Sequence, residues 1–265
     1  MPELAEVAFY AQKWSPGLGQ KVSKVWIDAQ SRVFRGADLG AFADLSACEF
    51  RSIQTHGKRM LFGFSKGVWL SGHLGMTGKL STEDPELRPF AKHDRLIITL
   101  ESVELIFNDA RHFGRMEVVE EASDLPTFWS KLPHDVRSDL FDLVYFKAHL
   151  SRRPRANVKA LLLEQSVCPG IGNWMADEIL WRARIDPRRT VGSLNRSEPS
   201  KFYQALCEVV EDAMRVIAPD WGDAPDSWLF NQRWKNGGVC PRTQKALTRE
   251  TIAGRTTCWS PAWQK

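Results

Sequence analysis

The stretch of the chain that decides its fold is GIGNWMADEIL, at residues 170–180. Cys168 and Pro169 precede it, and proline and glycine together supply the backbone angles of a tight turn. Helical periodicity of apolar residues runs over 158–165 before the turn and over 173–183 after it. The sequence therefore predicts two helices joined by a short turn, with Asn173 opening the second helix.

Working outward from this turn, the chain divides into a β-rich part and a helical part. Pro2 to Trp14 predicts a helix, because its apolar residues recur every three to four positions and Ser15-Pro16-Gly17 ends it. Short β-rich runs from about Lys21 to Glu120 predict an antiparallel sandwich or barrel. The expected strands are 22–27, 60–64, 68–70, 96–100, 103–107 and 116–119, then 239–247, 248–252 and 256–259 around a turn at Ala253-Gly254. The other expected helices are 141–150 and 201–216.

Charge is unevenly distributed along the 265 residues, although the net charge is only +4. Residues 151–196 hold nine Lys and Arg against four Asp and Glu, a balance of +5. Residues 231–265 hold seven against one, a balance of +6, and the remainder is −7. Two basic segments on an acidic chain are typical of polyanion binding, and two solvated surfaces are the alternative.

Targeting and redox features indicate an intracellular protein. The apolar runs are too short to span a membrane, and Glu3 and Glu6 replace the basic start of a secretory signal. Five cysteines, an odd number at wide spacing, favour reduced thiols over a disulfide framework. We therefore expect a cytoplasmic, nucleoid-associated protein of the bacterial type that is not secreted.

Six ordered motifs resemble the formamidopyrimidine-DNA glycosylase / endonuclease VIII family. They are PELAEV at residues 2–7, Gly57-Lys58, HLGMTG at 73–78, NDARHFG at 108–114, the stretch 165–180, and Gly254-Arg255 with Gln264-Lys265. The resemblance runs essentially end to end, and residues 170–180 resemble the helix–two-turns–helix DNA clamp of that family. It implies an α+β fold: an N-terminal helix and antiparallel β-sandwich, a helix–two-turns–helix domain, and a C-terminal zincless β-hairpin finger. The expected domains are 1–130, 131–228 and 229–265.

The resemblance implies a bifunctional DNA glycosylase and AP lyase of base-excision repair, without a cofactor. Removal of Met1 exposes the secondary amine of Pro2, the expected Schiff-base nucleophile, since an α-amino group is partly neutral near pH 7. Glu3 is the expected proton donor, and Glu6 has a structural role in the N-terminal turn. The family usually has proline where this chain has Ala5, so the turn is less rigid. A proline that only begins a helix is the alternative for Pro2.

Further residues are assigned to DNA by the same resemblance. Lys58 and Arg255 are expected to contact phosphates next to the lesion and to assist elimination, and Asn173 brings an amide and helix N–H groups to a phosphate. Met76, Arg111 and Phe113 match the side chains that fill the stack after a nucleotide is extruded. Burial in a core is the alternative for Met76 and Phe113. We interpret His73 as structural.

The C-terminal segment departs from the family pattern. Most relatives hold a structural zinc with two Cys-x-x-Cys pairs, and the matching positions here are Cys240, Thr243, Ser260 and Trp263. Zinc sites of this kind need about four N, S or O ligands, so we expect no metal. Trp259, Trp263 and other apolar contacts are expected to hold the finger instead.

The substrate is expected to be damaged double-stranded DNA, bound by a monomer with no membrane association. Relatives that act on 8-oxoguanine have a longer loop before the finger, so the short segment Ala218–Leu229 argues against that preference. A catalytically weak or inactive damaged-DNA-binding protein is the alternative function. An RNA-binding clamp is a third possibility, and it would not need the N-terminal amine.

Overall fold

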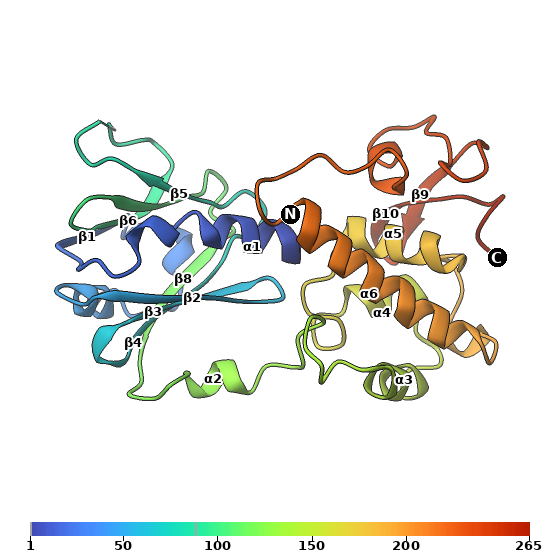
Figure 1. Cartoon of the computed structure of the whole chain (residues 1–265), viewed down its shortest axis with the longest axis horizontal. Coiled ribbons are helices and arrows are strands. Elements are labelled where there is room, and N and C mark those ends of the chain that lie inside the picture. The colour runs from blue at the N-terminus through green and yellow to red at the C-terminus, as the bar shows by residue number, and fades with distance from the viewer. Residues whose placement is uncertain (1, 88) are drawn as a thin grey trace. The chain divides into compact units, whose positions relative to one another are not determined.

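A computed structural model describes residues 2–87 and 89–265 of the chain (Figure 1). The chain forms two compact units. The β unit consists of Pro2 and Glu6–Leu132, and the helical unit consists of Glu3–Ala5 and Pro133–Lys265. Helix α1 (Leu4–Gln12) therefore contributes its first residues to the helical unit and the rest to the β unit.

The β unit is a sandwich of two antiparallel four-stranded sheets, with strand orders β1-β6-β7-β5 and β2-β3-β4-β8. Apolar side chains of both sheets form one core with Val7 and Ala11 of α1 and with Trp14, which follows that helix. The strands are β1 (Lys24–Ile27), β2 (Phe50–His56), β3 (Arg59–Phe64), β4 (Val68–His73), β5 (Lys79–Glu83), β6 (Asp94–Thr99), β7 (Glu104–Asn108) and β8 (Arg115–Glu120), followed by the short helix α2 (Thr127–Ser130).

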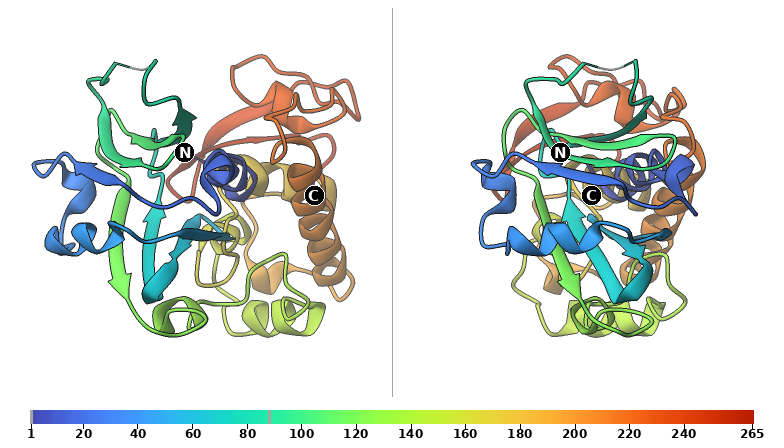
Figure 2. Two further views of the ribbon diagram at one scale, coloured as in Figure 1. Left: turned by 60° about the vertical axis from the view of Figure 1, so that its left-hand side comes forward. Right: turned by 90° about the vertical axis from the view of Figure 1, so that its left-hand side faces the viewer.

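The helical unit contains four main helices and a two-stranded sheet. Asp142 caps α3 (Leu143–Ser151) and Asn157 caps α4 (Val158–Leu163), each accepting backbone N–H bonds through its side chain. Helix α5 (Asn173–Ala183) packs against α6 (Glu198–Val216) and against β10 (Arg255–Trp259), which pairs with β9 (Thr248–Ile252) (Figures 1 and 2). The turn before α5 and the helix itself lie where the sequence predicted them.

Several expected elements differ from the structure. The strand predicted at 239–247 is wrong: only an isolated bridge joins Val239 to Ala246, because Pro241 lacks an N–H and Gln244 has a φ of 57°. Strands β2 and β5 and helix α2 were not predicted, since β2 and β5 carry many polar residues. Short 3-10 segments also occur, at 15–17, 32–34, 40–45, 65–67, 191–193 and 229–232.

Candidate active site and nucleic-acid interface

Glu3 is a buried carboxylate at the start of α5, with only 2% of its surface exposed. Its oxygens accept hydrogen bonds from the backbone N–H groups of Gly172 at 2.8 Å, Trp174 at 2.9 Å and Met175 at 3.1 Å. Backbone donors at a helix N-terminus, together with the helix dipole, stabilise a negative charge. The structure therefore fixes the position of a carboxylate one residue after Pro2.

This arrangement requires glycine at position 172, because the Glu3 side chain leaves no room for a Cβ atom there. A Cβ atom on Gly172 would lie 2.3 Å from Cδ of Glu3, closer than real contacts allow. The N–H of Leu4 also donates to the carbonyl of Gly170 at 3.1 Å, so the turn before α5 holds two consecutive residues of the N-terminus. A prolyl amine freed by loss of Met1 would be joined directly to this fixed segment; Met1 itself lies outside the described residues.

Asn173 departs in one respect from the expectation that helix N–H groups face a phosphate. The N–H groups of Gly172, Trp174 and Met175 donate hydrogen bonds to the Glu3 carboxylate instead, because this carboxylate occupies the helix terminus. The side-chain Nδ2 of Asn173 donates to the carbonyl of Thr256 at 2.9 Å. Asn173 thus connects α5 to the β9–β10 hairpin within the helical unit.

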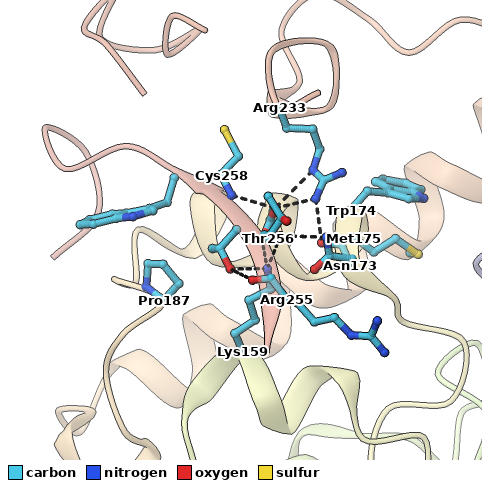
Figure 3. Close-up of polar contacts among 12 residues, drawn as sticks. Lys159, Asn173, Trp174, Met175, Pro187, Arg233, Arg255, Thr256 and Cys258 are labelled. Carbon is cyan, nitrogen blue, oxygen red and sulfur yellow. Dashed lines mark hydrogen bonds and ion pairs between the residues drawn. The ribbon is translucent and has the colours of Figure 1, made fainter. Parts of the chain in front are cut away.

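Arg255 follows a two-residue turn at the tip of this hairpin. Ala253 and Gly254 have φ angles of 51° and 71°, as in the turns that match the twist of paired strands. Arg255 pairs with Ile252 in the hairpin register and is exposed. Its side chain points away from the polar contacts below the hairpin (Figure 3), so its guanidinium is available to an anion.

A buried group of charges centred on Asp177 contacts the hairpin, because Asp177 accepts a hydrogen bond from the N–H of Cys258 in β10 at 3.0 Å. Asp177 forms ion pairs with Lys159 Nζ at 2.7 Å and with Arg233 Nη2 at 2.7 Å. Lys159 and Asp177 are 0% and 1% exposed, and Arg233 is 6% exposed. Burial lowers the pKa of the Lys159 amine, and the charge of Asp177 opposes that change. We call these three residues the Asp177 network.

The finger has an apolar core that includes Cys240, the one residue that matches a metal-ligand position of the family pattern. Trp181, Leu229, Cys240 and Cys258 form a buried cluster, with Leu247 and Trp263 packed against it. Burial raises the pKa of Cys240, but hydrogen bonds, including one from Trp181 Nε1 at 3.4 Å, bring it down to about 7. Within residues 2–87 and 89–265 no cluster of three or more His, Cys, Asp or Glu could hold a metal ion.

In the β unit, two loops carry the side chains expected to fill the DNA stack. Met76 is 44% exposed and Phe113 is 49% exposed, which fits a binding role better than a core role. The guanidinium of Arg111 lies 4.7 Å from the centre of the Phe113 ring, a cation–π distance. Gly75, with a φ of 61°, lets the loop of Met76 approach the backbone of Phe113.

Asp109, which is fully buried, holds these two loops together. Its carboxylate accepts hydrogen bonds from Thr77 Oγ1 at 2.7 Å, from the N–H of Arg111 at 3.1 Å and from the N–H of Gly114 at 2.7 Å. The donors come from both loops and none carries a formal charge. One carboxylate therefore fixes the backbone that carries the Met76, Arg111 and Phe113 side chains.

The β unit also carries basic side chains near His73, the residue that begins the loop of Met76. Lys58 lies in the hairpin between β2 and β3, next to Gly57 with its φ of 54°. A cleft of about 430 Å³ is lined by Arg59, His73 and Arg115, among others. Burial, followed by the charges of Arg59 and Arg115, lowers the pKa of His73, and its Nδ1 accepts the N–H of Gly75 at 3.2 Å. His73 therefore supports the loop of Met76.

A row of aromatic side chains extends from α5 to the first residues of the finger. Trp228 stacks on Trp174 with ring centres 6.4 Å apart, Phe230 contacts Trp174 edge-on at 5.0 Å, and Trp234 contacts Phe230 at 5.1 Å. Trp234, at the end of this row, is 55% exposed. The row begins on the residue whose N–H binds Glu3.

Sequence reasoning missed the roles of Asp109, Asp177, Lys159 and Arg233. A signal existed for Lys159, which interrupts an apolar helical run, and for Asp177, which lies on a helix with Trp174 and Trp181 at core spacing. Charged residues at core positions indicate buried pairing. The partners of Asp109 come from two loops and could not be read from spacing.

Comparison with known proteins shows what the chain is related to. The model of the formamidopyrimidine-DNA glycosylase N-terminal domain matches residues 1–116, and that of the formamidopyrimidine-DNA glycosylase H2TH domain matches 132–219. The formamidopyrimidine-DNA glycosylase of Thermus thermophilus is 33% identical, covering 100% of this chain and 98% of the relative. That of Desulfitobacterium hafniense is 32% identical with full coverage of both.

Solved structures of Lactococcus lactis Fpg are similar over the whole fold. Its complex with DNA containing an oxidised pyrimidine has a TM-score of 0.88 at 26% identity, covering 100% of both chains. Its complex with THF-DNA and an inhibitor has a TM-score of 0.87 at 27% identity, with the same coverage.

By fold and relationship the chain is a DNA glycosylase of base-excision repair. It belongs to the formamidopyrimidine-DNA glycosylase family. The predicted family, α+β fold and enzyme class are thereby confirmed. Over the part of the chain that the structure describes, no helix is both long and apolar enough to cross a membrane.

Proposed function

We propose that this chain excises a damaged base from double-stranded DNA through the amine of Pro2 and then cleaves the strand by β- and δ-elimination. The observation that carries the proposal is the Glu3 carboxylate, buried and held by three backbone N–H groups next to Pro2. A carboxylate fixed in this way can accept a proton and return it without moving.

The chemistry divides between these two residues. The neutral secondary amine of Pro2 attacks C1′ of the sugar, forming a C–N bond while the damaged base leaves. Glu3 takes the amine proton and passes it to the ring oxygen as the sugar opens, leaving an iminium. Loss of a C2′ proton then expels the 3′ phosphate, and a second elimination expels the 5′ phosphate.

Borohydride trapping on an abasic-site duplex tests the proposal. Protein without Met1, verified by mass measurement, should form a covalent adduct, because borohydride reduces the iminium to a stable amine. Protein that retains Met1 is the matched control, since the nitrogen of Pro2 is then an amide and not a nucleophile. No adduct from the processed protein would mean that the chain is a DNA-binding protein without this activity.

The role of Glu3 is tested separately with Gly172→Ala. The added Cβ would collide with Cδ of Glu3 and displace the carboxylate. We expect single-turnover cleavage to fall by about 10²–10⁴-fold, the usual contribution of a positioned acid–base group. Glu3→Gln should have the same effect, and Glu6→Gln, a helical turn away, should have a much smaller one.

The remaining site residues are proposed to bind DNA. Lys58, Asn173 and Arg255 contact phosphates near the lesion; the basic segments around Asn173 and Arg255 support this for those two residues, and the neighbouring Arg59 supports it for Lys58. Met76, Arg111 and Phe113 fill the space left by the extruded nucleotide, supported by their exposure. Replacing Phe113 with alanine should weaken binding to duplex but not to single-stranded DNA.

The working state of the protein is proposed to be a monomer at the bacterial nucleoid. One copy supplies the amine, the carboxylate and the loops, so a second copy has no evident part in the site. Light scattering of the protein with one abasic duplex should give the mass of one chain and one DNA. A panel of oxidised purines and pyrimidines would identify the lesion, and we expect 8-oxoguanine to be a poor substrate.

A further inference from the structure

The Asp177 network joins four separate segments of the helical unit. Lys159 comes from α4, Asp177 from α5, and Arg233 from the segment after residues 229–232. The fourth segment is β10, because Asp177 also accepts the N–H of Cys258 at 3.0 Å. Each charged side chain therefore binds the hairpin directly or binds the residue that does (Figure 3).

The contacts of this network converge on Thr256 and Thr257, the two residues that follow Arg255. The carbonyl of Thr256 accepts Lys159 Nζ at 3.2 Å and Asn173 Nδ2 at 2.9 Å. Lys159 Nζ also donates to Thr257 Oγ1 at 2.6 Å. The backbone on the C-terminal side of Arg255 is thus fixed by Lys159 of α4 and Asn173 of α5, the two helices that we call the clamp helices.

Arg233 adds a second connection, to Asn173. Its guanidinium donates to Asp177 at 2.7 Å and contacts the carbonyl of Asn173 at 3.5 Å. Asn173 and Arg255 are the two residues of this unit that we assign to phosphate contact. The network therefore connects both of them to a single carboxylate.

Stability alone is a poor reason for such a network. Buried ion pairs are often no more stabilising than apolar side chains of similar volume, because both charges lose their hydration. Charged partners do, however, fix distance and direction. Fixing the hairpin matters here because three of the four zinc-ligand positions of relatives hold Thr243, Ser260 and Trp263.

We propose that Asp177, Lys159 and Arg233 are positioning residues that fix the finger hairpin on the clamp helices and so place Arg255 on the DNA phosphates. This inference rests on the proposed function in taking DNA as the ligand and Arg255 as a phosphate contact. The network acts through Arg255, so its loss weakens phosphate binding without touching the amine of Pro2.

Binding to a duplex containing a tetrahydrofuran abasic analogue tests the proposal without any chemistry. Arg233→Met removes one cation and leaves the Lys159–Asp177 pair intact, so the chain should still fold. We expect affinity to fall roughly tenfold, as for the loss of one charge-assisted hydrogen bond. The slope of log K against log[salt] should fall by about 0.9, as for one lost phosphate contact.

The double variant Arg233→Met/Arg255→Ala separates positioning from general structure. If Arg233 acts through Arg255, the double variant should bind no more weakly than Arg255→Ala alone. Losses that multiply, or a salt slope unchanged by Arg233→Met, would overturn the proposal. Asp177→Asn should repeat the pattern if it folds.

Arg182→Met is the matched control on the same helix. Arg182 forms ion pairs with Glu178 at 3.0 Å and with Asp212 at 2.6 Å, and neither of these partners belongs to the hairpin. We expect it to lower the unfolding temperature and to leave DNA affinity and the salt slope unchanged. If Arg182→Met weakens DNA binding as much as Arg233→Met does, the Asp177 network contributes only to general stability and the positioning proposal is wrong.

Failure of the proposed function would give a result that differs from failure of the positioning proposal. Processed wild-type protein would then form no borohydride adduct, while the binding changes of the Arg233 variants would persist. The two proposals can therefore fail independently.

Discussion

The two units each organise the residues that we propose to contact DNA around one buried aspartate, but with different partners. Asp109 in the β unit accepts hydrogen bonds from two backbone N–H groups and a hydroxyl. Asp177 in the helical unit accepts one backbone N–H and two cationic side chains. The Asp109 carboxylate supplies hydrogen-bond acceptors to neutral donors that would otherwise bind water. The Asp177 carboxylate does this for one N–H group and also neutralises the buried charges of Lys159 and Arg233.

This difference follows from what each aspartate must hold. The loops of Met76 and Phe113 are short and close in space, so local backbone bonds can fix them. The β9–β10 hairpin is joined to α4 and α5 through residues far apart in sequence. Long side chains such as Lys159 and Arg233 can reach across that distance, but only as buried cations that need an anion.

The largest effect is expected for Asp177→Asn. The amide cannot neutralise Lys159 and Arg233, and breaking a buried pair costs about 3–5 kcal/mol. Urea unfolding followed by tryptophan fluorescence should show this loss, with faster hydrogen exchange in α5 and β10. The triple variant Lys159→Met/Asp177→Leu/Arg233→Met should recover much of the stability, since no charge remains unpaired, but not the DNA affinity.

Asp109→Asn should have a smaller effect on the unfolding free energy, about 1.5–3 kcal/mol. The amide keeps one acceptor oxygen and leaves only neutral donors without a partner. Exchange should increase at Arg111 and Gly114 and remain unchanged in α5. If Asp109→Asn costs as much as Asp177→Asn, the distinction between the two aspartates is wrong.

The sequence predicted the parts of the fold that depend on local rules. Proline and glycine at 169–172 located the turn before α5, and Ala253-Gly254 located the finger hairpin. Strands β2 and β5 were missed because Arg51, Gln54 and Lys79 interrupt their apolar pattern. These strands form by pairing with β3 and β7, and local propensity does not include the contribution of a partner strand.

The candidate site was predictable to a similar extent. Pro2, Glu3 and the exposed loops could be located from motifs, but the binding of Glu3 to Gly172 could not, because it joins residues 169 positions apart. Likewise, the apolar contacts of Trp263 were expected, whereas the charges beneath the hairpin were not. Tertiary contacts between distant charged residues leave no periodic signal in a sequence.

A pH-dependent effect is expected for His73. Burial and two arginines lower its pKa, so the folded state holds it neutral while the unfolded state binds a proton below about pH 6.5. Stability should therefore fall as the pH is lowered through that range, because the unfolded state gains a proton that the folded state does not. His73→Asn should reduce this dependence.

His149 in the helical unit controls for this prediction. Burial, then Arg153 and Arg152, lower its pKa too, so part of the acid sensitivity should remain in His73→Asn. Stability of both proteins measured by urea unfolding between pH 5 and pH 8 isolates the contribution of His73. If the wild-type protein and His73→Asn have identical profiles of stability against pH, the Met76 loop does not depend on His73.

The smallest effect is expected at the hairpin tip. Ala253 has a φ of 51°, where alanine is strained, and Asn-Gly is the preferred pair for such a turn. Ala253→Asn should stabilise the protein by about 0.5–1 kcal/mol, and Gly254→Ala should destabilise it by a similar amount. Neither should change DNA affinity if the Asp177 network, rather than the turn, fixes Arg255. A change in the salt slope with either variant would show that the turn shares this role, and the contrast between the two aspartates would then be weaker than their partners suggest.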